Sequence, residues 1–200
     1  MATLMHRQTF IILLLLFFVS QISLARQKSL SDTIILPEKI LKFIPKGYAL
    51  IDTVMGDLNL DKFQDIILVL KTIGEDTAFD ATEYKRPLLL LLGQADETFQ
   101  LAARNDNVVY CYQCGGAFGD PYDGVTIKKG AFAVYHFGGT NDRWSNEITF
   151  KYSKVDSTWY LFKIVDKGWN VFHLDKIDSM VKTKKDFGTV SFEKYNPDDD

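Results

Sequence analysis

The chain has 200 residues, about the length of one globular domain, and can bury a core without a dense disulfide framework. Hydrophobic residues make up 46% of the chain, charged residues 24%, and the net charge is −3, a composition that excludes a disordered protein. The 26 acidic residues outnumber the 23 basic ones, which argues against a nucleic-acid partner, because nucleic-acid-binding surfaces carry a basic excess.

The first 25 residues have the three parts of a secretory signal peptide. A segment with a His and an Arg (1–7) precedes an unbroken apolar run (10–19), and Ser23 and Ala25 are small residues at the −3 and −1 positions of a cleavage site. The apolar run is shorter than the roughly 20 residues that a membrane anchor needs. We therefore expect export to the periplasm or out of the cell, no stable membrane span after cleavage, and one mature domain, residues 26–200.

Pro37 is expected to begin a helix of at most two turns. Proline is favoured at the first position of a helix, Glu38 places an acid in the first turn, and the apolar residues that follow share one face. Pro45 and Gly47 end this short N-terminal helix.

Strands are expected in most of the rest of the chain, because short runs rich in Val, Ile, Phe and Tyr alternate with turn residues. Polar residues take every second position in 147–152, as in a sheet with one face in water, whereas 88–92 are all Leu and should form a central strand. Residues 173–185 fit a weak helix or an irregular loop. The fold class expected is all-β, mainly antiparallel sheet in a sandwich or partial-propeller arrangement. The expected strands are 48–55, 65–71, 87–92, 99–103, 108–112, 124–128, 132–137, 146–152, 159–165 and 189–192.

An acidic loop directly before the apolar strand at 66–70 is a candidate cation site. Asp57, Asn59, Asp61 and Asp65 stand at loop positions 1, 3, 5 and 9, and the backbone carbonyl of Phe63 stands at position 7. Ca²⁺ takes six to eight oxygen ligands, which alternate side chains of a tightly wound loop can supply. The loop is not an EF-hand, because position 12 is a leucine where that motif requires a bidentate Glu.

The spacing of these side chains resembles the calcium loops of FG-GAP or VCBS-type repeats, in which an Asp-x-Asn-x-Asp-Gly-x-x-Asp loop joins two antiparallel strands in integrin-like propellers. The resemblance implies one bound Ca²⁺ and covers residues 56–70 only. A propeller needs several blades, so the adhesive function of the wider family does not transfer. Lys62 stands where the family has a Gly that permits a left-handed turn. The alternative interpretation is a polar hairpin turn whose Asp and Asn side chains accept hydrogen bonds from nearby backbone amides.

Cys111 and Cys114 are the only two cysteines, and three chemistries fit their spacing. An oxidising compartment favours a disulfide. Thioredoxin-like redox work needs the first Cys at the start of a helix, whereas the surroundings indicate a strand and a Gly-rich loop. Zinc needs two more ligands, and His136 and His173 do not match a zinc-finger spacing.

A glycine-rich loop follows the cysteines and is the second candidate site. A phosphate-binding loop would need a following helix and often a Lys, and neither is indicated. The loop residues Phe118, Asp120, Tyr122 and Asp123, with Trp144 as a further aromatic anchor, could form a recognition surface, or they could serve only turn chemistry. The tract from Cys111 onwards also resembles small secreted bacterial proteins of unassigned function.

No recognised catalytic motif is present, and two classes of function stay open. The first is an exported binding or accessory module of the cell envelope, stabilised by one calcium ion, with an envelope or extracellular protein or glycan as its partner. The second is an exported hydrolase, which would require His136 to meet one of the carboxylates Asp120, Asp123 or Asp142 in a pocket.

Overall fold

The computed structural model describes residues 37–80 and 82–199. The expected signal peptide and its cleavage site lie outside these residues. Among the described helices, none has the length and apolar character needed to cross a bilayer.

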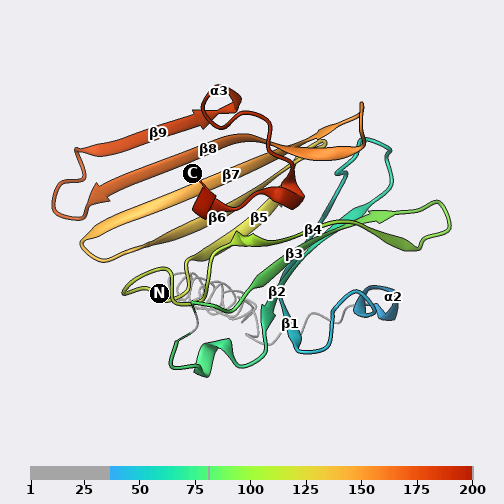
Figure 1. The fold of residues 1–200 in the computed structure, drawn as a ribbon, viewed down its shortest axis with the longest axis horizontal. Helices are drawn as coiled ribbons and strands as arrows, with labels where there is room; N and C mark the ends of the chain where they lie inside the picture. Colours follow the sequence, from blue (N-terminus) through green and yellow to red (C-terminus); the bar gives the residue numbers. More distant parts are fainter. Residues whose placement is uncertain (1–36, 81, 200) are drawn as a thin grey trace, which may run out of the picture. The chain divides into compact units, whose positions relative to one another are not determined.

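The chain forms two antiparallel sheets in which each strand pairs with the next one in sequence (Figure 1). The first sheet has the order β1-β2-β3-β4 and the second has the order β5-β6-β7-β8-β9. This architecture is mainly antiparallel β and sandwich-like, so the predicted fold class is confirmed. The strands are β1 (Tyr48–Gly56), β2 (Asp65–Thr72), β3 (Arg86–Gly93), β4 (Phe99–Val109), β5 (Tyr122–Ile127), β6 (Ala131–Gly139), β7 (Asp142–Ser153), β8 (Thr158–Asn170) and β9 (Ile177–Thr183).

Helical segments are short. The predicted N-terminal helix is present as α2 (Glu38–Leu41), one residue later at its start and shorter than expected, with Ile40 buried. A second helix, α3 (Lys184–Phe187), follows β9, and Thr183 and Asp186 form its capping box. Three single 3₁₀ turns complete the described elements: η2 (Glu75–Thr77), η3 (Phe192–Lys194) and η4 (Pro197–Asp199).

The hydrophobic core combines side chains of both sheets. Leu88 and Leu90 of β3 belong to the same buried cluster as Val134 of β6 and Phe150 of β7. The leucine run is buried on both faces of β3, since Leu88 to Leu91 are each at most 2% exposed and β3 lies between β2 and β4. The predicted central strand is therefore confirmed.

The expected break between strands at 99–103 and 108–112 is wrong, because one strand, β4, runs through it. The polar stretch inside β4 resembled a turn, but its side chains are satisfied within the strand. Arg104 pairs with Asp106 at 2.6 Å, and the buried Asn105 Oδ1 accepts the backbone N–H of Val108 at 2.7 Å. Polar composition therefore did not end the strand.

Two expectations near the C-terminus also fail. Residues 177–183 form strand β9 rather than a helix or loop, and the predicted last strand at 189–192 makes only a single bridge, from Ser191 to Tyr160. Phe192 explains the second failure. Its ring is fully buried edge-on against Phe132 and Phe150, so this segment packs by its side chain rather than by a strand ladder.

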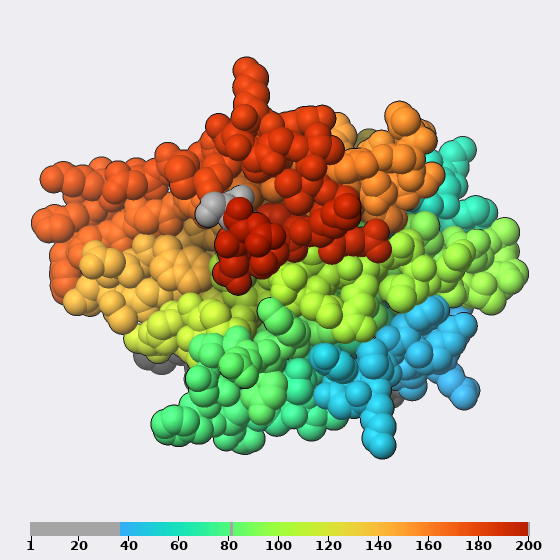
Figure 2. Space-filling model, viewed as in Figure 1, coloured from blue at the N-terminus to red at the C-terminus, as the bar shows by residue number. Residues whose placement is uncertain are grey.

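The C-terminal segment lies across β4. Asn105 Nδ2 donates to the carbonyl oxygens of Phe192 and Tyr195, at 2.5 and 2.7 Å. Figure 2 shows the C-terminal residues, in red, on the surface against the green to yellow-green middle of the chain. This contact brings the last described residues beside the loop that follows β4.

Candidate functional site

The acidic loop connects β1 and β2, as the hairpin interpretation required. Its side chains hold the backbone tightly: Asp57 Oδ1 accepts the N–H of Leu60 at 2.6 Å and Asp61 Oδ1 accepts the N–H of Phe63 at 2.8 Å. Asn59 Nδ2 donates to the second carboxylate oxygen of Asp61 at 2.6 Å. Lys62 has a φ of 76°, so it takes the left-handed conformation that the family places on a Gly.

Asp65 anchors this loop in the interior. Its carboxylate is fully buried and accepts the N–H of Leu58 at 2.6 Å and that of Gly93 at 2.9 Å, which ties the loop to the end of β3. The carbonyl of Leu58 accepts the indole N–H of Trp159 from the second sheet, at 3.0 Å. Burial, together with the charges of Asp61 and Asp57, raises the pKa of Asp65 above its ordinary value.

The loop side chains fit a divalent cation in spacing. One carboxylate oxygen from each of Asp57, Asp61 and Asp65 lies within 4.8 Å of the others. Ligands that share one Ca²⁺ at about 2.3–2.6 Å are at most roughly 5 Å apart, so this spacing is compatible with a common ion. The same three carboxylates accept backbone amides, so the hydrogen bonds of the turn interpretation are present as well.

Cys111 and Cys114 form a disulfide, as the compartment argument predicted, with a Cα–Cα distance of 5.2 Å. The disulfide opens the glycine-rich loop, in which the N–H of Gly115 donates to the carbonyl of Gly119 at 2.8 Å. A Cβ on Gly115 would come within 2.5 Å of that carbonyl oxygen, so the loop can close this tightly only with glycine there. The N–H of Gly139 donates to the carbonyl of Gly115, which fixes the loop on β6.

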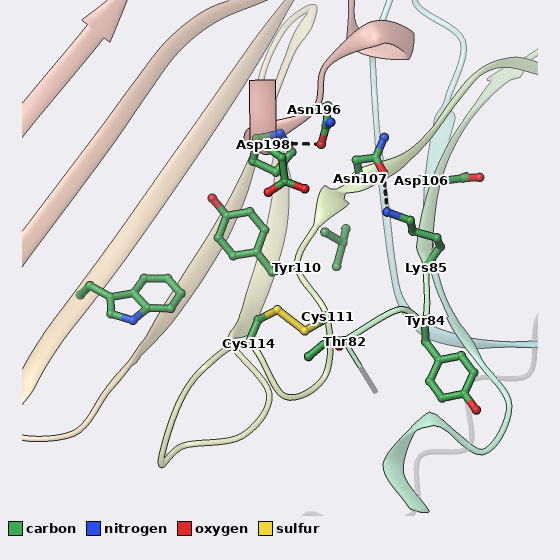
Figure 3. Close-up of a pocket in the computed structure, with 13 residues that line it drawn as sticks. Thr82, Tyr84, Lys85, Asp106, Asn107, Tyr110, Cys111, Cys114, Asn196 and Asp198 are labelled. Atoms are coloured by element: carbon green, nitrogen blue, oxygen red, sulfur yellow. Dashed lines mark hydrogen bonds between the residues drawn. A yellow bond between two sulfur atoms is a disulfide. The ribbon is translucent and has the colours of Figure 1, made fainter. Parts of the chain in front are cut away.

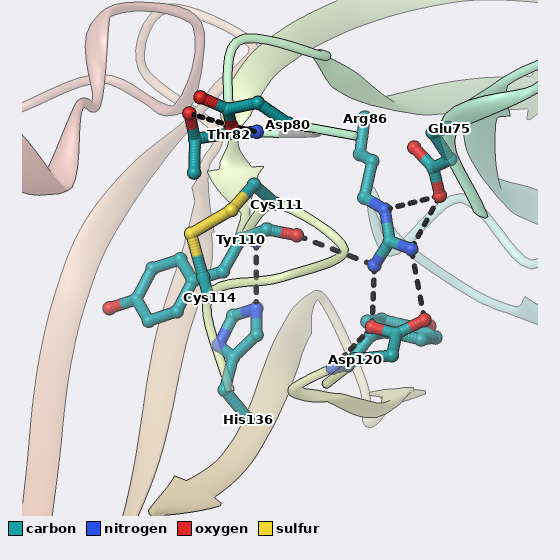
Figure 4. The surroundings of a disulfide bond; sticks show 10 residues. Glu75, Asp80, Thr82, Arg86, Tyr110, Cys111, Cys114, Asp120 and His136 are labelled. Carbon is teal, nitrogen blue, oxygen red and sulfur yellow. Dashed lines mark hydrogen bonds and ion pairs between the residues drawn. A yellow bond between two sulfur atoms is a disulfide. The ribbon is translucent and has the colours of Figure 1, made fainter. Parts of the chain in front are cut away.

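A buried arginine holds the far side of this loop (Figure 4). Arg86, at the start of β3, is 1% exposed. Its guanidinium donates to Glu75 through Nε at 2.9 Å, to Asp120 through Nη1 at 2.6 Å and Nη2 at 2.9 Å, and to the carbonyl of Tyr110 at 3.4 Å. It also lies 5.6 Å from the ring centre of Tyr112. One cation therefore connects η2, β3 and both ends of the glycine-rich loop.

The residues proposed as a recognition surface lie in different places. Asp120 is engaged by Arg86, and Tyr122 is partly buried, with its hydroxyl donating to Asp52 Oδ2 at 2.9 Å. Burial, followed by the nearby charge of Asp52, raises the pKa of this tyrosine above its ordinary value. Phe118 packs on Phe137 with ring centres 5.1 Å apart, and Asp123 is exposed on β5.

Trp144 is the one of these five residues that lines a cavity beside the disulfide. The cavity has a volume of about 400 Å³ and is also lined by Tyr84, Tyr110 and both half-cystines. A Cβ on Gly138 would come within 2.6 Å of the Trp144 ring, so glycine gives the indole its place over β6.

Polar groups surround these rings. Asn107, Asn196 and Asp198 line the cavity, together with Lys85 and Asp106. Lys85 Nζ donates to Asn107 Oδ1 at 2.9 Å, and Asp106 is paired with Arg104. Figure 3 shows Asn196 and Asp198, from the C-terminal segment, next to Asn107 and Tyr110. Aromatic faces and hydrogen-bonding side chains thus meet in one open space.

Comparison of the chain with protein-family models, curated proteins and solved structures finds no match in any of the three. The function is therefore inferred from the chemistry of the residues themselves.

His136 lies on the inner face of β6, stacked on Tyr110 at a centroid distance of 4.0 Å. Its Nε2 accepts the backbone N–H of Tyr110 at 3.3 Å, so in the neutral ring Nδ1 carries the proton and faces Asn146 Oδ1 at 3.4 Å. Asn146 in turn donates to Asp166 at 2.6 Å. Burial lowers the pKa of His136 to about 4, so the ring is neutral at pH 7.

Within the described residues, no hydrogen bond joins His136 to any of the three carboxylates named for a hydrolase. Asp120 is bound to Arg86, Asp142 accepts a hydrogen bond from Asn170 at 2.7 Å, and Asp123 is exposed. The ring therefore holds Tyr110, the residue directly before the disulfide, in place.

Sequence reasoning missed Arg86, Glu75 and the C-terminal side of the cavity. A charged residue two positions before the five leucines of β3 was the one available signal that a cation enters the core there. Asn196 and Asp198 carried no such signal, because their position depends on the burial of Phe192.

We expect His136 to make the protein less stable in mild acid. The pKa of His136 is about 4 in the folded protein and about 6.5 in the unfolded chain, so between these pH values the unfolded chain binds a proton at this histidine more readily. The free energy of unfolding should therefore fall by up to about 3 kcal/mol as the pH drops from 6.5 towards 4. Urea unfolding between pH 7.5 and 4 should show a shallower pH dependence in His136→Gln than in the wild type. His173→Gln, which changes an exposed histidine, is the control and should keep the wild-type slope. Parallel curves for wild type and His136→Gln would contradict this account.

Proposed function

We propose that the protein is an exported binding module of the cell envelope and that the cavity beside Trp144 takes a carbohydrate chain. The observation that carries the proposal is the composition of this cavity, which is lined by the aromatic residues Trp144, Tyr110 and Tyr84 and by amide and carboxylate side chains. Ligand sites of proteins combine apolar walls with a few well-placed polar groups in this way.

Sugars match such a lining because each ring has an apolar C–H face and a rim of hydroxyl groups. The C–H face can lie against Trp144 or Tyr110, while Asn107, Asn196 and Asp198 can accept or donate hydrogen bonds at the rim. The disulfide between Cys111 and Cys114 is compatible with an oxidising compartment, where envelope glycans are encountered.

Calcium enters the proposal as a structural ion. Asp57, Asp61 and Asp65 would hold it, with Asn59 and the carbonyl of Phe63 as further oxygen ligands. The support is the carboxylate spacing of 4.8 Å or less and the left-handed Lys62, which winds the loop as the family does. Since the buried Asp65 connects the loop to Gly93, an ion there would stiffen the first sheet and leave the cavity chemistry to other residues.

The alternative of an exported hydrolase draws no support from the geometry of its central residue. Both ring nitrogens of His136 face hydrogen-bond partners within the fold, the amide of Tyr110 and the side chain of Asn146. A general base needs a nitrogen within reach of a substrate proton.

The carbohydrate proposal predicts that Trp144→Ala weakens binding to envelope glycan. Wild-type protein should co-sediment with purified peptidoglycan sacculi, and Trp144→Ala should reduce the bound fraction at least tenfold, because the loss of one stacking ring costs about 1.4 kcal/mol or more. Trp169→Ala is the matched control, since Trp169 packs on Phe137, outside the cavity, and should bind as the wild type does. Absence of wild-type binding, or equal loss in both variants, would contradict the proposal. Capture of a protein instead of glycan would redirect it.

Calcium is predicted to raise the thermal stability of the protein. At about 100 times its Kd, a ligand that binds only the folded state adds roughly 2.7 kcal/mol, which should raise the Tm by several degrees relative to EDTA. An Asp57→Ala, Asp61→Ala double variant should lose this increase. An Asp80→Ala, Asp96→Ala variant should retain it, because these two exposed carboxylates lie outside the acidic loop and accept hydrogen bonds from Thr82 and Thr98 in their own turns. A wild-type Tm that is equal in calcium and EDTA would leave the loop as a hairpin turn.

A further inference from the structure

Three of the four sheet edges have a neighbour within the described part of the chain, and β9 has none on its outer side. Strand β1 lies beside β5, so close that a Cβ on Gly56 would come within 2.7 Å of Ile127. The edge of β4 is lined by the C-terminal segment through Asn105. Strand β9 pairs with β8 and ends the second sheet (Figure 1).

Strand β9 lacks two of the features that usually protect an edge, a bulge and a proline, although it carries the charged residues Asp178 and Lys182. It pairs with β8 in an unbroken register from Ile177 to Thr183, without a bulge or a proline. Its apolar side chains Ile177, Met180 and Val181 are 58%, 52% and 54% exposed. A regular edge strand with exposed apolar residues is a template for pairing with another strand.

The charged residues of β9 are complementary to those of a second, antiparallel copy of β9. Asp178 and Lys182 lie two residues on either side of Met180 and on the same face of the strand, because side chains alternate along it. In an antiparallel pair of two β9 strands centred on Met180, each Asp178 stands directly opposite the second copy's Lys182. Opposite charges at directly opposed positions stabilise a strand pair, and like charges destabilise it.

Other registers of the same two strands are poorer. A parallel pair in register sets Asp178 against Asp178 and Lys182 against Lys182. An antiparallel pair centred on Ser179 sets Ile177 against Val181 but also Asp178 against Met180, so it forms no ion pair within the strand. The register centred on Met180 is the one that uses all seven residues of β9 and also places Val181 diagonally next to the second copy's Ile177.

We infer that two copies of this chain associate through β9 about a two-fold axis at Met180, so that the two five-stranded sheets join edge to edge. A self-complementary patch of this kind gives a closed dimer rather than a filament, because the described strands of each copy offer one such edge. The backbone hydrogen bonds supply most of the attraction, and the two Asp178–Lys182 pairs set the register.

The test is a charge-exchange experiment on protein made from the complete 200-residue sequence, read by sedimentation velocity at 10–200 μM and low salt. The wild type should be a dimer. Asp178→Lys and Lys182→Asp should each turn both ion pairs into repulsive pairs, which weakens association by roughly thirtyfold. An equimolar mixture of the two variants should form a heterodimer, because each opposed pair of positions 178 and 182 then joins a lysine of the first variant to an aspartate of the second.

Two controls separate this dimer from a general charge effect. Lys154→Asp changes an exposed lysine in the β7–β8 turn and should leave the dimer intact. The exchange variant Asp178→Lys, Lys182→Asp should restore it within one chain. A wild type that is monomeric at 200 μM, or single variants that dimerise as well as the wild type, would overturn the inference.

Discussion

The arrangement around the cavity depends on one buried cation. Arg86 is 1% exposed, and a charge withdrawn from water to this degree is tolerated only when it is paired and its donors are satisfied. Glu75 and Asp120 supply the opposite charge from two separate loops, 11 and 34 residues away in sequence. The guanidinium fork can meet both carboxylates only when the η2 turn and the glycine-rich loop are in their observed positions. The ion cluster of Arg86, Glu75 and Asp120 therefore fixes the positions of both loops.

The positions of the other site residues follow from this ion cluster. Arg86 also donates to the carbonyl of Tyr110, the residue that follows β4. Tyr110 is therefore fixed between the arginine on one side and the stacked His136 ring on the other. Tyr110 then faces the cavity near Trp144, with a centroid distance of 6.2 Å. The disulfide and the hydrogen bond from Gly139 to Gly115 close the loop over β6. The candidate site is thus preformed by polar interactions, while the leucine-rich core stabilises the sandwich beneath it.

Local patterns were enough to predict most strands, the hairpin at the acidic loop and the Cys111–Cys114 pair, because each depends on residues close together in sequence. The left-handed turn at Lys62 was not predicted, because the sequence showed only that a lysine stands where the family has a Gly. Strand β9 was missed because the polar residues Asp178, Ser179 and Lys182 interrupt its apolar pattern at an edge where both faces meet water. The partners of Arg86 and the burial of Phe192 could not be read from the sequence, because both depend on contacts between distant segments.

The most direct measurement of this account is the free energy of unfolding of Arg86→Met beside that of Arg104→Met. Both arginines hold a carboxylate through two hydrogen bonds, but Arg104 and Asp106 are 39% and 38% exposed. We predict that Arg86→Met loses about 3 kcal/mol or more, because it strands a buried carboxylate, and that Glu75→Gln added to it recovers part of the loss. Arg104→Met should lose less than about 1 kcal/mol. Equal losses for the two arginines, or no recovery with Glu75→Gln, would contradict the central place given to Arg86.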